Sequence, residues 1–155
     1  MTNPTKAFFW PACQPQSFDP QKAKVPRKSC WFKPFKFNQA GYDAVYIESD
    51  NGLVRFVQVT QSKTHSFGIE HFAKLLNKLV EPEMKKNKHL KPSDIIKTIE
   101  IFFVVEKKTE APKLQLTPVT GQGSLECYGW QDGEENRKVR IVSIECVNSW
   151  SQIDW

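Results

Sequence analysis

Three polar side chains near the middle of the chain could do chemistry together: Asp43, Gln58 and Thr60. Each lies at one end of a run rich in β-branched and aromatic residues, as strands are. A carboxylate and an amide at the end of an apolar face must find partners, because burying them unpaired is costly. A divalent cation is one such partner, since hard cations prefer carboxylate and amide oxygens. A hydrogen-bond network with backbone amides is the other, and the spacing leaves both open.

The two runs predict a β-hairpin over residues 42–61, because the sequence between them, Ser49–Gly52, has strong turn chemistry. If these four residues form the loop, Asp43 lies opposite Gln58. If the loop has only two residues, Asp43 lies opposite Thr60. Side chains alternate across a strand, so both registers place the three polar groups on one face. This face is the candidate catalytic site.

Residues 69–80 predict an amphipathic helix, because their apolar side chains recur on one stripe at helical spacing. We expect Ser66 to cap this helix and Glu70 to favour its first turn. We expect Pro82 to end or kink it. A short helical turn is expected from Ser93.

The apolar run Ile99–Val105 predicts a strand buried on both faces. Residues 107–123 are polar and weakly patterned, whereas residues 138–147 alternate again and predict a last strand. The order of elements predicts an α/β or α+β fold with a central mixed β-sheet flanked by helices. A chain of 155 residues fits a single domain. Its expected parts are an arm (1–38), a core (39–105), and a loop with a C-terminal strand (106–155).

The arm differs in composition from the rest of the chain, because prolines recur there among aromatic residues. Prolines at this density argue against a long helix or a central strand. The aromatic residues argue against disorder, which is poor in them. We expect an extended arm with a short helix near Gln21. Aromatic residues such as Trp31 are expected to pack on the core, to stack on bases, or to dock a protein partner.

Two clusters of basic residues are candidates for contacts with nucleic acid. The chain has 22 Lys and Arg against 17 Asp and Glu, a mild basic bias that is compatible with a polyanionic partner. The alternative is that both clusters are solvated surfaces. One cluster is formed by Lys85, Lys86, Lys88 and Lys91, and the other includes Lys33 and Lys36.

The sequence argues against a membrane partner and against a zinc site. No apolar run approaches the length of a membrane span. The four cysteines have neither CxxC spacing nor a nearby histidine, so we expect thiols in a reducing compartment. These cysteines are Cys13, Cys30, Cys127 and Cys146.

The run YDAVYIESDNGLVRFVQVTQSKTH, residues 42–65, carries a resemblance to a known family. Followed by an amphipathic helix and an apolar strand, it resembles the nuclease-like domain of Crinkler-type effectors and retrotransposon-hot-spot proteins. These domains are similar in turn to the PD-(D/E)xK restriction-endonuclease-like superfamily. In that superfamily one aspartate opens the second core strand, and (D/E/Q)xK lies on the third. The resemblance covers Asn38 to Val105 and implies a restriction-endonuclease-like core.

The resemblance implies a metal site. Asp43 matches the first position of the motif and Gln58 the second, so these two would hold Mg²⁺ or Mn²⁺. The ion would lower the pKa of a bound water and neutralise charge on the phosphate. A third acid is expected from Asp19 in the arm or Glu70 on the helix, because Glu48 has the wrong strand parity.

The resemblance also implies the chemistry. Thr60 stands where the superfamily has lysine, so Lys63 and, second, His65 are the candidates for that catalytic role. We therefore expect a divalent-metal-dependent nuclease-like domain of effector or mobile-element type that cleaves DNA or RNA. The alternative is a catalytically inactive module on the same fold that binds nucleic acid or a protein partner. The resemblance implies action inside a cell, with the nucleus of a host cell as the destination of a secreted effector.

Overall fold

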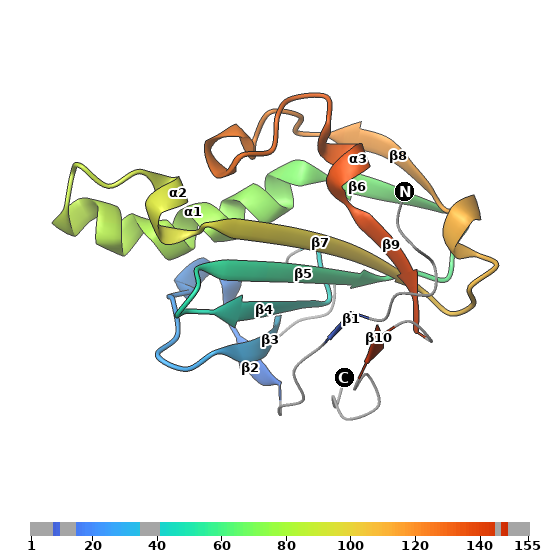
Figure 1. The fold of residues 1–155 in the computed structure, drawn as a ribbon, viewed down its shortest axis with the longest axis horizontal. Helices are drawn as coiled ribbons and strands as arrows, with labels where there is room; N and C mark the ends of the chain where they lie inside the picture. The colour runs from blue at the N-terminus through green and yellow to red at the C-terminus, as the bar shows by residue number, and fades with distance from the viewer. Residues whose placement is uncertain (1–7, 10–14, 35–40, 145–146, 149–155) are drawn as a thin grey trace.

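The computed structural model describes residues 8–9, 15–34, 41–144 and 147–148. Its centre is a six-stranded sheet with the order β2-β3-β4-β5-β7-β9 (Figure 1). β4 runs antiparallel to β3 and β5, whereas β7 is parallel to both β5 and β9. The sheet is therefore mixed, as the sequence predicts. Its strands are β2 (Gln16–Phe18), β3 (Cys30–Pro34), β4 (Ala44–Glu48), β5 (Leu53–Val59), β7 (Thr98–Val105) and β9 (Arg140–Ser143).

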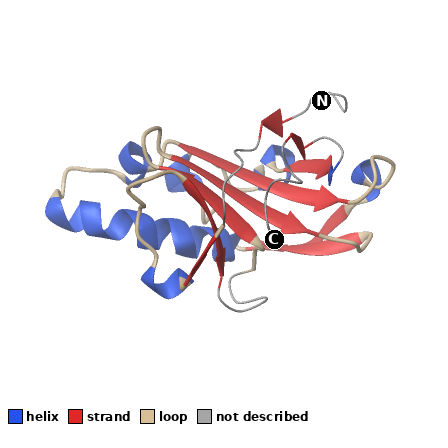
Figure 2. Cartoon of the chain, turned by 90° about the horizontal axis from the view of Figure 1, so that it is seen from below, coloured by secondary structure: helices blue, strands red, loops and turns tan. Residues whose placement is uncertain are grey.

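One long helix, α1 (Ile69–Lys86), packs on one face of this sheet, and Figure 2 shows it beside the long strands. β6 (Thr64–Gly68) and β8 (Gln115–Thr120) form a second sheet, and β1 (Phe8–Phe9) and β10 (Val147–Asn148) pair as a third. The shorter helices are η1 (Pro20–Lys22), α2 (Pro92–Ile95), η2 (Ala111–Lys113), η3 (Glu126–Tyr128) and α3 (Glu135–Lys138).

The central sheet buries a hydrophobic cluster on each face. The larger cluster joins odd-numbered residues of β7, such as Ile101 and Phe103, to α1 residues such as Phe72 and Leu76. Phe102 and Val104 of β7 belong to the smaller cluster with Trp31. The prediction of a strand buried on both faces is thus confirmed. An interior strand of a covered sheet must be apolar on both sides.

The predicted hairpin is confirmed in the register that has a four-residue loop. Glu48 pairs with Leu53, and the loop lies between them. Gly52 has a φ of 64°, in the left-handed region that glycine adopts at little cost. Asn51 Nδ2 donates a hydrogen bond to Glu48 Oε1 at 2.7 Å, which closes the turn.

The described part of the proline-rich segment contributes two strands, β2 and β3, to the central sheet. Its prolines were expected to exclude a central strand, but β3 lies between β2 and β4. Pro26 precedes β3 and Pro34 is its last residue, so neither interrupts the middle of its ladder. Trp31 is fully buried against Tyr46, with ring centroids 5.2 Å apart, so it packs in the core. The short helix expected near Gln21 is η1.

The predicted start and end of α1 need correction. Ser66 lies in β6, and the residue before the helix is Gly68, which has no side chain to cap it. Glu70 lies in the first turn as expected. The helix does not end at Pro82, because a proline removes only one helical hydrogen bond and Met84 beyond it packs on the core.

The sequence does not predict the second sheet. β8 falls in the polar stretch 107–123, which has no clear alternation. The pairing of β6 with β8 shifts register between His65 and Phe67, and such an irregularity disturbs the period-two pattern. The last strand is also shorter than predicted: it begins only at Arg140, because the chain through Lys138 forms α3.

The remaining expectations concern single features. α2 includes the helical turn expected from Ser93. The thiols of Cys30, which is buried, and Cys127, which is exposed, carry no disulfide; Cys13 and Cys146 lie outside the described residues. Across the described residues, no helix is both long and apolar enough to cross a membrane.

A buried carboxylate organises the loop between β8 and β9. Glu135 is 1% exposed; its Oε2 accepts the N–H of Gly123 at 2.7 Å and its Oε1 that of Gly133 at 2.8 Å. Burial opposes ionisation, but these donors and the backbone N–H groups of Glu134 and Glu135 outweigh it and lower the pKa of Glu135. The ionised carboxylate therefore ties two turns of the loop together.

Replacing Glu135 by glutamine is expected to lower the free energy of unfolding by about 2 kcal/mol, because an amide N–H would face a backbone N–H. The folded pKa is lowered, so the stabilisation is present above the ordinary glutamate value of 4.5 and is lost as the pH falls through the folded pKa. Urea unfolding of both proteins from pH 7 down to pH 3 should show the difference narrowing. The exposed Glu134→Gln is the matched control, and an equal effect of both variants at pH 7 would contradict the role of Glu135.

Candidate active site

Asp43 and Gln58 meet where β4 begins and β5 ends. Asp43 lies directly before β4, and its N–H donates to the carbonyl of Val57 at 2.9 Å. Its Oδ2 accepts the N–H of Val59 at 2.7 Å and Gln58 Nε2 at 3.1 Å. Gln58 Nε2 also donates to the carbonyl of Val59 at 3.2 Å. The predicted neighbours are therefore in contact, and a network with a backbone amide satisfies one carboxylate oxygen.

The surroundings of Asp43 favour its neutral form. Burial raises the pKa of Asp43, while the N–H of Val59 and the proximity of His65 lower it by a smaller amount, so the net shift is upward. A carboxylate that is costly to ionise gains from a bound cation, because the cation compensates for the lost hydration.

His65 is close enough to act electrostatically on this carboxylate. The backbone carbonyl of Lys63 accepts the N–H of Gln115 at 2.9 Å, and its side chain has no described partner. The ring of His65 packs on Phe103 with centroids 5.5 Å apart. Its Nδ1 lies 2.6 Å from the carbonyl oxygen of Ser66. A carbonyl can only accept, so Nδ1 carries a proton, and in the neutral form of the ring the lone pair is on Nε2. The Lys63 side chain is exposed to solvent. Of the two candidates from the sequence, the geometry favours His65.

Thr60 holds the end of β5 in place. It is 6% exposed, and its N–H donates to the carbonyl of Val104 at 2.9 Å. Its Oγ1 accepts the N–H of Ser62 at 3.2 Å, which stabilises the turn that follows. Thr60 is thus a buried, neutral residue with a structural role.

Two oxygens of this site are suited to a metal ion. Asp43 Oδ1 and Gln58 Oε1 accept no hydrogen bond from the described residues. Mg²⁺ usually keeps several waters and is bound by one or two carboxylates together with substrate phosphates. These two oxygens fit a site of that open kind. They do not make a closed cage: within the described ranges no group of three His, Cys, Asp or Glu could hold a metal.

The two candidates for a third acid are engaged elsewhere. Asp19 Oδ1 accepts the N–H of Gln21 at 3.0 Å and caps η1. Glu70 accepts a hydrogen bond from Thr120 Oγ1 at 2.9 Å. The expectation that one of them completes the metal site is therefore not supported by their contacts.

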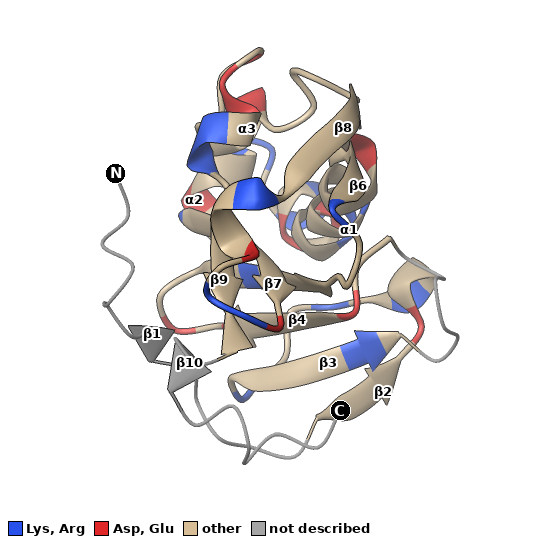
Figure 3. Ribbon diagram, turned by 90° about the vertical axis from the view of Figure 1, so that its right-hand side faces the viewer, with Lys and Arg blue, Asp and Glu red and all other residues tan. Residues whose placement is uncertain are grey.

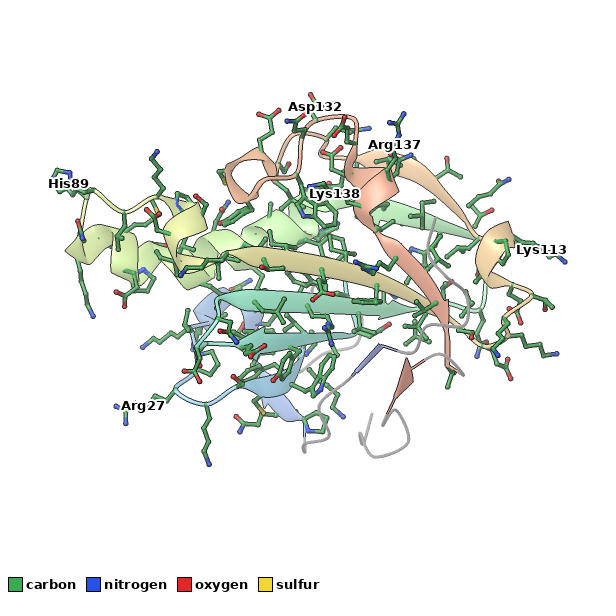
Figure 4. The ribbon with its side chains drawn as sticks, in the orientation of Figure 1. Arg27, His89, Lys113, Asp132, Arg137 and Lys138 are labelled. Atoms are coloured by element: carbon green, nitrogen blue, oxygen red, sulfur yellow. The ribbon has the colours of Figure 1, made fainter. Side chains whose placement is uncertain are left out.

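The predicted lysine cluster lies at the far end of α1 from Asp43. The helix has 18 residues and is about 27 Å long at 1.5 Å per residue. Figure 4 labels His89 just beyond this end. Lys85 Nζ pairs with Glu81 Oε1 at 2.9 Å. Lys33 is partly buried on β3, and Lys36 lies outside the described residues.

Sequence reasoning missed two lysines that link this cluster to the site. Lys74 and Lys78 are exposed on α1 and share a helical face with Lys85. The stripe starts near the site, because a side-chain carbon added at Gly41 would lie 2.9 Å from His71 on the first turns of α1. The spacing of these lysines is visible in the sequence, but their position in one pocket with Tyr42, the residue before Asp43, is not.

A second basic group was also missed. Arg137 and Lys138 of α3, with Arg140 of β9, line a groove of about 700 Å³. Figure 3 shows Lys and Arg segments gathered on α3. The short basic run RKVR at residues 137–140 is the sequence pattern that could have revealed this group.

No protein-family model matches this chain, and no curated protein or solved structure matches it significantly. Membership of a nuclease family therefore stays a prediction. The chemistry of the site has to follow from the positions of its own residues.

Asp43 is expected to titrate above the ordinary aspartate value of 3.8. Its pKa is raised in the folded protein, so its favourable contribution is present below 3.8 and is lost as the pH rises through the folded pKa. Carboxyl-carbon NMR would give the midpoint. Urea unfolding should show that the stability of the wild type relative to Asp43→Asn falls between pH 3 and pH 7. A midpoint at or below 3.8 would show that the hydrogen bonds outweigh burial.

Proposed function

We propose that this chain is a nuclease-like domain that cleaves phosphodiester bonds with a divalent metal ion at Asp43. One observation carries the proposal. Asp43 directly precedes β4, Gln58 lies on β5, and Gln58 Nε2 donates to Asp43 Oδ2 at 3.1 Å. The resemblance puts the same two motif positions on the second and third core strands of the PD-(D/E)xK superfamily.

The order of elements around the site supports a restriction-endonuclease-like core. β3, β4 and β5 pair in antiparallel fashion, so β4 is the second strand of this unit and β5 the third. α1 follows, and β7 then pairs in parallel with β5. This is the amphipathic helix and apolar strand that the resemblance includes.

Asp43 Oδ1 and Gln58 Oε1 would hold Mg²⁺ or Mn²⁺. When bound, the ion would neutralise charge on the phosphate and lower the pKa of a bound water. With one carboxylate and one amide, the protein supplies a single negative charge. Metal affinity is therefore expected to be weak without substrate, whose phosphate oxygens complete the coordination.

His65 would act as the general base. Its Nδ1–H is held by the carbonyl of Ser66 and its ring by Phe103, so Nε2 is kept oriented as a proton acceptor. Nε2 takes a proton from water, whose oxygen forms a new bond to phosphorus. The bond from phosphorus to the leaving sugar oxygen breaks, and that oxygen takes a proton from solvent.

The test is incubation of the purified chain with plasmid DNA and with RNA, in Mg²⁺, in Mn²⁺ and in chelator. Metal-dependent cleavage is expected to be abolished by Asp43→Ala. His65→Ala should lower the rate by about 100-fold or more, the usual contribution of a general base. Lys63→Ala is the matched control and should leave the rate nearly unchanged, because its side chain is exposed.

Two outcomes would contradict this mechanism. Cleavage that survives Asp43→Ala would come from another site or a contaminant. A larger loss with Lys63→Ala than with His65→Ala would assign the catalytic role to the lysine. No cleavage in either metal would favour the second candidate function.

That second candidate is a catalytically inactive module of the same fold that binds nucleic acid. Thr60 favours it, because this buried neutral side chain cannot replace the lysine of the superfamily. The basic stripe of α1 would be the binding surface. From Lys74 to Lys85 the stripe spans about 17 Å at 1.5 Å per residue, which corresponds to about five base pairs at 3.4 Å each.

Binding to a duplex of about ten base pairs tests the stripe whether or not cleavage occurs. Lys74→Ala with Lys78→Ala is expected to weaken binding and to reduce the slope of log K against log salt by about 1.8, or 0.9 for each lost phosphate contact. Arg137→Ala with Lys138→Ala changes the charge equally and should leave the slope nearly unchanged. Fluorescence anisotropy at several salt concentrations gives both slopes, and equal slopes for the two double variants would contradict a defined surface.

A further inference from the structure

The basic groove lies beside the N-terminal half of β7. Residues 98–100 form one wall, and Trp130 with residues 137–140 forms the other. Trp130 is 5% exposed, so it packs into the wall and offers no open ring face. Lys138 Nζ lies 5.8 Å from the centre of this ring and donates to the carbonyl of Gly129 at 3.0 Å. One wall of the groove is therefore built on a buried tryptophan, with the Lys138 ammonium group above it.

The other wall is a sheet edge that no described strand covers along residues 98–101; Thr98 is exposed there, and Ile99 is 6% exposed. β9 pairs only with residues 102–105 of β7. Along residues 98–101, β5 is the only described strand that pairs with β7. An exposed strand edge presents backbone donors and acceptors that another strand can use.

The direction of the backbone groups follows from two hydrogen bonds. The N–H of Thr98 donates to the carbonyl of Gly52, directly before β5. The carbonyl of Val104 accepts the N–H of Thr60, directly after β5. Even-numbered residues of β7 thus direct their backbone groups toward β5. Because the direction alternates along a strand, the N–H and C=O of Ile99 point toward the groove.

The groove carries excess positive charge. Arg137 and Lys138 are exposed, and Figure 4 labels both on α3, above β7. Arg140 adds a third cation to the lining. Glu100 is the acidic residue of the lining, and Arg55 neutralises it with an N–O distance of 3.2 Å. A partner with acidic side chains would find complementary charge here.

We propose that this groove binds an extended acidic peptide, which adds to β7 as a new strand in line with β9. A peptide backbone offers both donors and acceptors to Ile99, as strand addition requires. A DNA strand offers phosphate acceptors but no donors along its backbone, and RNA adds only its 2′-hydroxyl groups, which do not have the alternating spacing of peptide N–H and C=O groups. Buried Trp130 also gives bases no surface for stacking. The inference uses no residue of the Asp43 site, so it stands apart from the proposed function.

Amide hydrogen exchange tests the open edge in the protein alone. The N–H of Ile99 is expected to exchange faster than those of its neighbours Thr98 and Glu100, which face β5. It should become protected when the peptide binds. Protection of Ile99 in the free protein would show that the edge is already covered and would overturn the proposal.

Binding is measured by fluorescence anisotropy with a labelled octapeptide in which glutamate alternates with valine. Two probes serve as controls: the same peptide with lysine for glutamate, and one with alternate backbone nitrogens methylated to block strand pairing. Both are expected to bind at least about tenfold more weakly. Arg137→Glu with Lys138→Glu should weaken binding of the acidic peptide by a similar factor. Lys85→Glu with Lys86→Glu, an equal charge change on α1, should alter binding less than about twofold.

Equal binding of the methylated peptide would mean that charge alone is recognised and would overturn strand addition. Equal loss in the two double variants would also overturn it, because the attraction would then belong to the whole surface. A single-stranded oligonucleotide that displaces the peptide and itself protects Ile99 would assign the groove to nucleic acid instead. Thermal unfolding of each variant checks that the fold is retained.

Discussion

One register of pairing between β4 and β5 places Val45 and Phe56 in the core and, at the same end of the hairpin, Asp43 beside Gln58. A slip by one residue would turn every apolar side chain of a strand to the opposite face. The cost of exposing that face fixes the register, and the register in turn fixes the polar pair. The geometry of the candidate site is therefore a consequence of hydrophobic burial around it.

The pKa values of two carboxylates, those of Glu135 and Asp43, are shifted in opposite directions. Glu135 is held by several backbone N–H groups, and they lower its pKa although it is buried. Asp43 receives one backbone N–H and one amide, and burial prevails, so its pKa is raised. The number of oriented donors decides the sign in each case. Glu135 is suited to holding a loop, whereas Asp43 retains capacity for a cation.

The unequal lengths of β7 and its neighbours create the second surface of interest. β7 is covered on both faces, so its side chains contribute stability and little recognition. The N-terminal half of its edge offers only backbone groups for recognition. β9 does not cover this half, because the residues before β9 form α3. Cations from that helix then lie next to open backbone groups, which combines strand pairing with charge selection.

The sequence by itself determined the hairpin, its turn, the apolar stripe of α1 and the burial of β7. Alternation, turn chemistry and helical periodicity are properties of neighbouring residues. It also limited Asp43 to two partners, of which Gln58 is the actual one. Only the tertiary structure decided that β3 lies inside the sheet, that β6 pairs with β8, and that His65 acts electrostatically on Asp43. These outcomes depend on contacts between segments far apart in the chain, where pairing and burial override local preference.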